Sequence, residues 1–328
     1  MPGKIQSSSE TSKTDPAQKV LALLQKKDAR YKFKQIASAT GLNHREIEEA
    51  ISEIRKTHKN LVYAKFDRTF YLGDTPTWYS NETDLSTVMP TEGVFGVVSD
   101  THLGSVAERL DILKLAFDRF EEVGVKQVFH CGDVTDGWME YRGHMNFVKV
   151  YGSQPQAKRV VQCWPKREGI VTYAIAGNHD MDSYSKDKVD RLSLVTHGFQ
   201  HEGKDVPARN DFVYLGQYSH TIILPQQVTM HMIHPRGNAA YAMSYKQQKR
   251  SEAMDRNLRP DIQLSGHYHT FTYIWVNHTH FIAVPGQQDE TEFFKRLGLP
   301  RSVGFLLVYY KIEGGKLIYL RPEVHMDE

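Results

Sequence analysis

Five apolar runs in this sequence each end in Asp, Asn or His, and this shared ending constrains the fold more than any other feature. Short apolar runs of this kind are typical of buried strands. In α/β sheets, functional sites form beyond the carboxyl ends of the strands, so we expect these polar side chains to meet. A solvated loop would accept Ser, Lys or Glu equally well. The runs are VFGVVSD, VKQVFHCGD, GIVTYAIAGNHD, VTMHMIHP and IQLSGHYH, and they place Asp100, His102, Asp133, Asn178, His179, His234, His267 and His269 at or just after their ends.

The last run raises a question of geometry. His267 and His269 are separated by one residue and follow Gly266. In an extended strand, side chains alternate between faces, so both imidazoles would point to the same side. Two imidazoles on one face are either stacked on the surface or aimed at a common object.

The order of the elements indicates the fold class. Early strands alternate with helical segments, such as the face formed by Leu110, Leu113, Phe117 and Phe120. Later strands crowd together, and the last two form a hairpin that we expect to turn at Gly314 and Gly315. This pattern predicts an α/β protein in which a layered β-sandwich is flanked by helices.

The chain divides into four segments by composition and pattern. Residues 1–15 lack an apolar core and are expected to form a disordered arm, and residues 16–75 read as three helices followed by a hairpin with its turn at Asp67 and Arg68. Asn43 begins the third helix, with Glu46 three residues later, which is a capping-box pattern. We expect a winged helix-turn-helix-like domain over 16–75, a linker over 76–92 and the main domain over 93–328.

The N-terminal domain is more basic than the rest of the chain. Residues 16–73 contain 12 Lys and Arg and 6 Asp and Glu, whereas residues 74–328 contain 27 Lys and Arg and 31 Asp and Glu. A basic module favours a polyanionic partner, with the third helix in a groove and Lys65 or Arg68 on phosphate. The same helix also carries four glutamates, so a protein–protein or dimerisation module, with a homo-oligomer as its product, stays an alternative.

The remaining composition is typical of a globular cytoplasmic protein. No run approaches the ~20 apolar residues needed to cross a bilayer, and no signal peptide is recognisable, so no membrane partner is expected. Cys131 and Cys163 form no redox or metal motif and are expected to be reduced.

The ordered set of motifs resembles the calcineurin-like metallophosphoesterase superfamily. Its signature is D-x-H, G-D, G-N-H-D/E, H and G-H-x-H, and all five parts stand in this order between residue 93 and about 285. The resemblance implies the metallophosphoesterase fold and two divalent metal ions. Asp100, His102 and His269 would hold one ion, Asn178, His234 and His267 the other, and Asp133 would bridge them. Mixed oxygen and nitrogen ligands suit Mn²⁺, with Fe or Zn²⁺ as alternatives.

The resemblance also implies a chemical role for His179. The matching histidine of the superfamily contacts the phosphate and assists the leaving oxygen, and Asp180 would orient it. Arg236, which follows His234 closely, could offer a second phosphate contact. His130 and His231 also lie near the motifs, but they are expected to be packed residues, because Asp133 and His234 fill the ligand positions.

The superfamily alone does not decide the substrate. With the basic module, we expect a metal-dependent phosphodiesterase of nucleic acid, DNA in preference to RNA, related to the DNA-repair nucleases of the superfamily. The segment from His234 to His269 is similar to uncharacterised phage and prokaryotic phosphoesterases. The alternatives are a small-molecule phosphomonoesterase or cyclic-nucleotide phosphodiesterase with an N-terminal assembly domain, and a non-catalytic nucleic-acid-binding protein.

Overall fold

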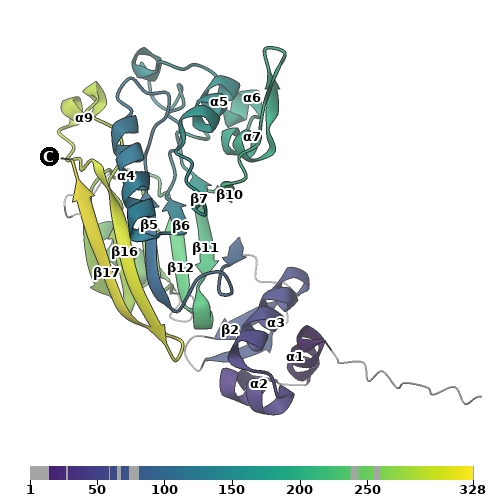
Figure 1. The fold of residues 1–328 in the computed structure, drawn as a ribbon. Coiled ribbons are helices and arrows are strands. Elements are labelled where there is room, and N and C mark those ends of the chain that lie inside the picture. Colours follow the sequence, from purple (N-terminus) through teal and green to yellow (C-terminus); the bar gives the residue numbers. More distant parts are fainter. Residues whose placement is uncertain are drawn as a thin grey trace, which may run out of the picture. The chain divides into compact units, whose positions relative to one another are not determined.

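The computed structural model divides the chain into two compact units, residues 1–79 and 80–328 (Figure 1). Each unit is described by itself. The structure describes residues 15–26, 29–58, 60–64, 68–73, 81–237, 242, 244–254 and 259–327.

The N-terminal unit consists of three helices and a small antiparallel sheet. The helices are α1 (Pro16–Leu24), α2 (Phe33–Thr40) and α3 (His44–Thr57), and the sheet has the order β1 (Tyr31–Lys32), β3 (Thr69–Leu72), β2 (Leu61–Ala64). Asn43 and Glu46 form the predicted capping box, since each side chain accepts a hydrogen bond from the backbone N–H of the other residue. Ile36, Ile47 and Phe70 are fully buried in a core of the unit's own.

The predictions for this unit were its secondary structure and a winged helix-turn-helix function. The structure shows the predicted helices and hairpin strands, and it adds β1 as a third strand. A winged helix-turn-helix function stays a prediction. Arg68 directly precedes β3 and has a φ of 57°, whereas Lys65 and Asp67 lie outside the described residues.

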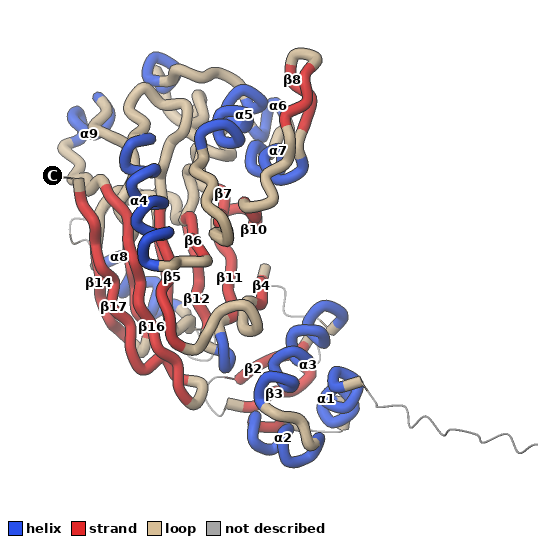
Figure 2. The backbone as a smooth tube through the Cα atoms, in the orientation of Figure 1, coloured by secondary structure: helices blue, strands red, loops and turns tan. Residues whose placement is uncertain are grey.

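The second unit contains two six-stranded sheets (Figure 2). The first sheet has the order β10 (Phe212–Gln217), β7 (Val171–Ala176), β6 (Gln127–His130), β5 (Glu92–Val98), β16 (Gly304–Glu313), β17 (Lys316–Met326). The second has the order β14 (Thr272–Val276), β15 (Thr279–Ala283), β13 (Ile262–Ser265), β12 (Thr229–Ile233), β11 (Ser219–Ile223), β4 (Glu82–Asp84). Strands β5, β6, β7 and β10 run parallel, as do β12, β13 and β15.

The two sheets pack face to face, and helices cover the first of them. One apolar cluster joins Phe95 and Phe129 of the first sheet to Met230 and Ile282 of the second. Another packs the first sheet against helices α4 (Leu110–Val123), α5 (Ser153–Cys163) and α7 (Arg191–His197) (Figure 1). The structure thus confirms the layered α/β sandwich flanked by helices, and it places the last hairpin's turn at Gly314 and Gly315, as expected.

The other elements are short and connect these layers. They are α6 (Tyr184–Asp187), α8 (Tyr245–Ala253), α9 (Glu292–Leu297), β8 (Phe199–His201), β9 (Lys204–Val206) and two 3₁₀ turns (His144–Phe147 and Pro225–Gln227). In the part of the chain that the structure describes, no helix has the length and apolarity required to span a bilayer.

The linker expected over 76–92 differs in the structure. Residues 82–84 form β4, which pairs in parallel with β11, and β5 already begins at Glu92. The side chain of Thr83 also bonds His220, at 2.9 Å. Leu85 and Met89 are buried in the core between the sheets. The later part of this segment therefore belongs to the second unit.

Candidate active site

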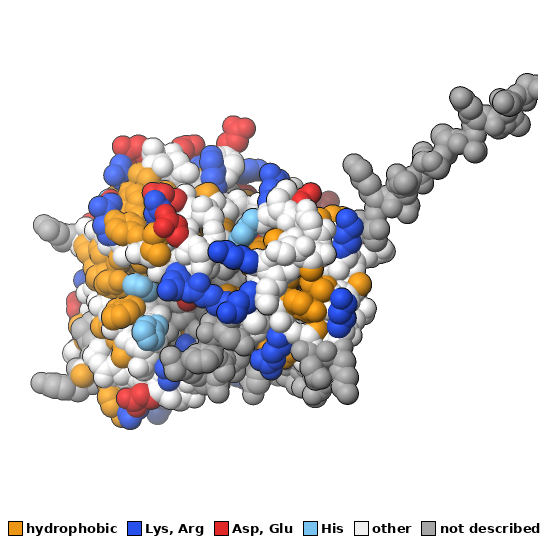
Figure 3. All heavy atoms as spheres, turned by 90° about the horizontal axis from the view of Figure 1, so that it is seen from below, with side chains coloured by type: hydrophobic (Ala, Val, Ile, Leu, Met, Phe, Trp, Pro, Cys, Tyr) orange, Lys and Arg blue, Asp and Glu red, His pale blue; other side chains and the backbone are white. Residues whose placement is uncertain are grey.

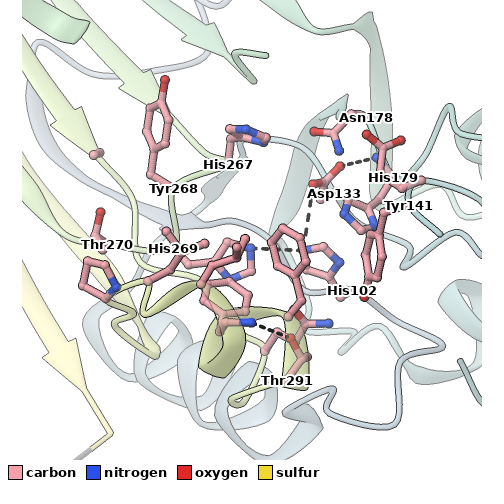
Figure 4. A pocket seen from close by; sticks show the side chains of 18 of the residues that line it. His102, Asp133, Tyr141, Asn178, His179, His267, Tyr268, His269, Thr270 and Thr291 are labelled. Carbon is pink, nitrogen blue, oxygen red and sulfur yellow. Dashed lines mark hydrogen bonds and ion pairs between the residues drawn. The ribbon is translucent and has the colours of Figure 1, made fainter. Parts of the chain in front are cut away.

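The ends of five strands meet at one edge of the sandwich. In the first sheet, Asp100 and His102 follow β5, and Asp133 follows β6. Asn178 and His179 follow β7 of the same sheet. Strands β12 and β13 of the second sheet lead into His234, and into His267 and His269. A cavity of about 710 Å³ opens above them, and its lining includes His102, Asp133, Asn178, His179, His267 and His269 (Figure 4). Asp100 and His234 are buried beneath this lining.

The backbone of the site is unusual, because most of the expected ligands have positive φ angles. Non-glycine residues rarely adopt this conformation, and it clusters at functional sites. The angles are 50° at Asp100, 44° at His102, 55° at Asp133, 81° at His267 and 50° at His269. This corrects the expected geometry of the histidine pair, because β13 ends at Ser265 and the two imidazoles diverge from a loop.

Two glycines allow the loops to approach one another. A Cβ atom on Gly132, whose φ is 97°, would lie 2.4 Å from Nδ1 of His234. A Cβ atom on Gly266 would lie 2.5 Å from the carbonyl oxygen of Cys131. Any larger residue at either position would push the two sheets' loops apart.

The structure brings together Asp100, His102 and His269 in a first cluster of potential metal ligands. The Nε2 atoms of His102 and His269 are 3.2 Å apart, and Nε2 of His269 is 3.5 Å from Oδ1 of Asp100. His102 donates from Nδ1 to Oδ1 of Asp136 at 3.0 Å, which directs its Nε2 lone pair into the cluster.

A second cluster contains Asp133, His234 and His267, with Asn178 beside them. His234 donates from Nδ1 to the carbonyl of Cys131 at 2.8 Å, so its Nε2 carries the lone pair of the neutral ring. This Nε2 nevertheless lies 3.0 Å from Oδ1 of Asn178 and 3.1 Å from Oδ2 of Asp133, which are also acceptors. Acceptors that face one another in a buried site require a positive charge between them, and a divalent cation fits this requirement.

Without a bound cation, a second proton on the His234 ring meets this requirement. Burial lowers the pKa of His234, but the carboxylates of Asp133 and Asp100 outweigh it and raise this pKa to about 9. Burial raises the pKa of Asp133, but His234, His179 and His102 hold it well below its usual range. Oδ2 of Asp133 is also 3.9 Å from Nε2 of His102, so this carboxylate reaches both clusters.

His179 lies beside the clusters and faces the cavity (Figure 4). Its backbone N–H donates to Oδ1 of Asp133 at 2.8 Å, and its Nδ1 donates to the backbone carbonyl of Asp136 at 2.6 Å. Within the described residues Nε2 has no hydrogen-bond partner. The pKa of this imidazole is lowered, chiefly by burial.

Asp180 does not orient His179, contrary to the sequence-based expectation. Its carboxylate accepts hydrogen bonds from the backbone N–H groups of Val134, Thr135 and Gly177 and from the hydroxyl of Thr135. Asp180 therefore ties the loops after β6 and β7 together, and the Asp136 carbonyl is the group that orients the histidine.

Asp136 and His144 were missed by the sequence analysis. Asp136 accepts from His102 at 3.0 Å, from His144 at 3.3 Å and from Gln288 at 3.3 Å. Burial raises the pKa of Asp136, but the hydrogen bonds from His102 and His144 and the charges of His102 and His179 hold it below the usual range. The signal was the second aspartate in GDVTDG, three residues after Asp133.

A buried ion pair fixes the loop that carries His179. Arg191 is fully buried and donates to the carbonyls of His179 and Asp180 at 2.6 and 2.9 Å, and it pairs with Asp182. Asp182 in turn accepts from the backbone N–H of Trp138 at 2.6 Å. This pair connects the His179 loop to the loop that follows Asp136.

Arg236 does not lie at the cavity, where a phosphate contact was expected of it, whereas Lys246, which the sequence did not single out, does. Arg236 is exposed, donates to the hydroxyl of Tyr218 at 2.5 Å and does not line the cavity. Lys246 of α8 does line it, and no partner for its ammonium group occurs among the described residues. A Cβ atom on Gly237 would lie 3.6 Å from Nζ of Lys246, and the carbonyl of Gly237 accepts from Nε2 of His267 at 3.0 Å. The ammonium group of Lys246 therefore lies beside the second cluster of potential metal ligands.

The two additional histidines lie outside both clusters. His130 is buried between Thr101, at 3.2 Å, and the N–H of Gly132, and burial lowers its pKa to about 3. His231 contacts the hydroxyl of Thr221 on the neighbouring strand at 3.1 Å.

Comparisons with known proteins identify the family of this chain through one match to a family model. The family model for the calcineurin-like phosphoesterase superfamily domain matches residues 94–299. A search of curated proteins found no significant match. Similar solved structures include an archaeal phosphodiesterase, with 13% identity over 71% of this chain and 99% of the other and a TM-score of 0.39. Another is Vps29 of Entamoeba histolytica in complex with Zn²⁺, with 12% identity over 71% of this chain and 98% of the other and a TM-score of 0.34. A third is a predicted phosphoesterase of Streptococcus pneumoniae TIGR4, with 14% identity over 72% of this chain and 100% of the other and a TM-score of 0.32.

These structural similarities are too distant to bear on the substrate. The family match, in contrast, covers more than half of the chain and includes all five strand-end motifs. The paired clusters supply the donors that divalent metal ions need. The chain therefore belongs to the calcineurin-like phosphoesterase superfamily and is a metal-dependent hydrolase of phosphoester bonds.

Proposed function

We propose that this protein is a two-metal phosphodiesterase that acts on nucleic acid, with DNA as the first candidate and RNA as the second. The observation that carries the proposal is the Asp133 carboxylate, which reaches both clusters of ligands at the floor of one open cavity. The Nε2 atom of His179, for which the described residues offer no hydrogen-bond partner, lies in the same cavity.

The roles of the ligands follow from the two clusters. Asp100, His102 and His269 would hold one ion, and Asn178, His234 and His267 would hold the other, with Asp133 shared. When bound, such ions polarise a phosphoryl group and lower the pKa of a water molecule near it. Mn²⁺ is the first candidate, with Fe and Zn²⁺ as alternatives, because no thiolate is present in either cluster.

His179 would donate a proton to the leaving oxygen. Because Nδ1 is committed to the Asp136 carbonyl, a second proton on the ring must be carried by Nε2, which faces the cavity. The Arg191–Asp182 pair keeps the loop in place, so the imidazole need not be ordered during the reaction.

A screen of metals against substrates tests this proposal. Chelator-treated protein would be supplied with Mn²⁺, Zn²⁺, Fe²⁺ or Mg²⁺ and offered bis-p-nitrophenyl phosphate, p-nitrophenyl phosphate, and linear or circular DNA and RNA. We expect metal-dependent hydrolysis of the diester and of polynucleotides. Hydrolysis of the monoester alone would identify a phosphomonoesterase instead.

We expect Lys246→Ala to raise the KM for bis-p-nitrophenyl phosphate about tenfold, because a charge-assisted hydrogen bond to the phosphate is lost. The matched control is Lys249→Ala on the same helix, since Lys249 pairs with Glu252 on the exposed side. Steady-state kinetics of both variants and of Arg236→Ala provide the measurement. If only Arg236→Ala raises the KM, Arg236 rather than Lys246 contacts the phosphate.

The N-terminal unit is proposed to bring nucleic acid to the catalytic unit. Its excess of basic residues supports this, and on α3 two of the glutamates are paired with cations, Glu49 with Arg45 and Glu53 with Lys56. On the face drawn in Figure 3, Lys and Arg side chains are more prominent than those of Asp and Glu. Arg68, and Lys65 outside the described residues, stay the candidates for phosphate contacts.

Deletion of residues 1–79 is expected to raise the KM for a long polynucleotide but to leave hydrolysis of bis-p-nitrophenyl phosphate unchanged. The catalytic ligands all lie in the second unit, and the basic surface only raises the local concentration of substrate. Kinetics at several salt concentrations provide the measurement, since polyanion binding weakens with salt. Unchanged polynucleotide kinetics together with a change in oligomeric state would identify an assembly unit.

The proposed location is the cytoplasm. Both cysteines, Cys131 and Cys163, are free thiols in the structure, as a reducing compartment would leave them.

A further inference from the structure

The cavity has two unlike sides. Its floor is formed by the polar ligand clusters, whereas one side is an apolar surface that we call the α9 wall, formed by Tyr141, Phe147, Phe293, Phe294, Leu297 and Leu299. Four of these residues come from α9 and the turn after it. The phosphoesterase chemistry assigned above uses none of them.

The α9 wall is built directly onto the ligand clusters. The ring of Phe294 lies 4.9 Å from that of His269, centroid to centroid. Phe293 stacks on Tyr141 at 5.0 Å, and Tyr141 stacks on His144 at 4.5 Å, which is the histidine bonded to Asp136. A group attached to a phosphate on the floor would therefore meet aromatic rings at once.

The wall also leaves apolar and polar groups uncovered. Leu297 is 53% exposed although it lines the cavity, and Phe293 is only half-buried. Within the described residues the hydroxyl of Tyr141 has no hydrogen-bond partner, and burial, together with the Asp136 carboxylate, raises its pKa to about 12, so it stays protonated. A ligand that is planar and apolar, with polar atoms at its edge, would cover the rings and satisfy the hydroxyl.

A nucleobase has these properties, and every base has a face that stacks on aromatic side chains. The base must also be unpaired, because a base within a duplex is stacked between its neighbours and cannot reach a wall beside the scissile phosphate. A cavity of about 710 Å³ accommodates a ligand of the size of a nucleotide.

We propose that the α9 wall is a subsite for one unpaired base next to the scissile phosphate, so that the enzyme acts on single-stranded positions of its substrate. This inference rests on the nucleic-acid phosphodiesterase function proposed above and specifies which form of nucleic acid the site takes.

The experiment compares two single-stranded oligonucleotides of the same length, one of thymidines and one with tetrahydrofuran abasic residues. The wild-type enzyme, loaded with the best metal ion, is expected to cleave the thymidine strand with a kcat/KM about tenfold higher or more. Phe293→Ala and Leu297→Ala are expected to lower kcat/KM for the thymidine strand only, so that the two substrates become nearly equal.

The matched control is Leu115→Ala. Leu115 lies on α4, is 55% exposed and is not part of the cavity, so the same substitution at nearly the same exposure should change neither rate. If the preference for thymidine persists in both wall variants, or if the wild type shows no preference, the base subsite is wrong while nucleic-acid hydrolysis stands. If neither strand is cleaved although bis-p-nitrophenyl phosphate is hydrolysed, the base subsite is wrong. Nucleic acid as the substrate is then also excluded if the duplex DNA and RNA of the screen described above are left intact.

Discussion

His179→Asn is expected to lower kcat for a natural phosphodiester by on the order of 10²–10⁴, because the proton for the leaving oxygen is no longer supplied. The loss should shrink for bis-p-nitrophenyl phosphate, whose leaving group departs without a proton. The bound metal content should be unchanged, since the imidazole belongs to neither of the ligand sets assigned to the two ions.

The control for this substitution is His197→Asn, at an exposed position of α7 outside the cavity. Kinetics on a series of aryl and alkyl diesters, together with elemental analysis for metal, provide the measurement. An equal loss on all leaving groups would exclude proton donation by His179, and a loss of metal would make this residue a ligand.

Asp133→Asn is expected to lower activity by more than about 10²-fold and to reduce the amount of metal retained. The removed charge is the one that both clusters share, and even indirect partners of metal ligands typically contribute 10- to 100-fold. The measurement is metal content after gel filtration, followed by diesterase activity over a range of metal concentrations.

Asp205→Asn provides the matched control, because Asp205 is exposed on β9 and, among the described residues, its carboxylate accepts a hydrogen bond from Gln200 alone. If Asp133→Asn kept its full metal content and activity, the carboxylate would not join the two clusters. The ligand assignment would then have to be revised around Asp136, whose carboxylate lies within the same group of histidines as His102 and His179.

The sequence predicted the layers and the strand ends well, for a local reason. A buried parallel strand is a short apolar run, and the residue at which the run stops is visible in the sequence. This is sufficient to place Asp100, Asp133, Asn178 and His234 at one edge of the sandwich. The capping box of Asn43 and Glu46 was equally readable, because both partners lie within one turn of helix.

Contacts between distant loops could not be read in this way. The bonds of Asp180 to Thr135 and of Asp136 to His102 join residues 45 and 34 positions apart, and nothing local distinguishes these aspartates from solvated ones. The positive φ angles of His267 and His269 are imposed by the packed loops rather than by the residue type. The strand β4 carries no apolar alternation and exists only because β11 offers an edge.

Both ligand clusters draw side chains from both sheets, and this has a consequence for the order of events during synthesis. Asp100 and His102 follow β5, whose neighbour β16 (Gly304–Glu313) is made only after His269, the final ligand along the chain. A nascent chain that has formed only one of the two sheets therefore holds only part of each ligand set, and a partial set binds divalent ions weakly. Metal capture is therefore expected to follow the docking of the two sheets, and a nascent fragment that ends before His269 lacks a ligand of the first set.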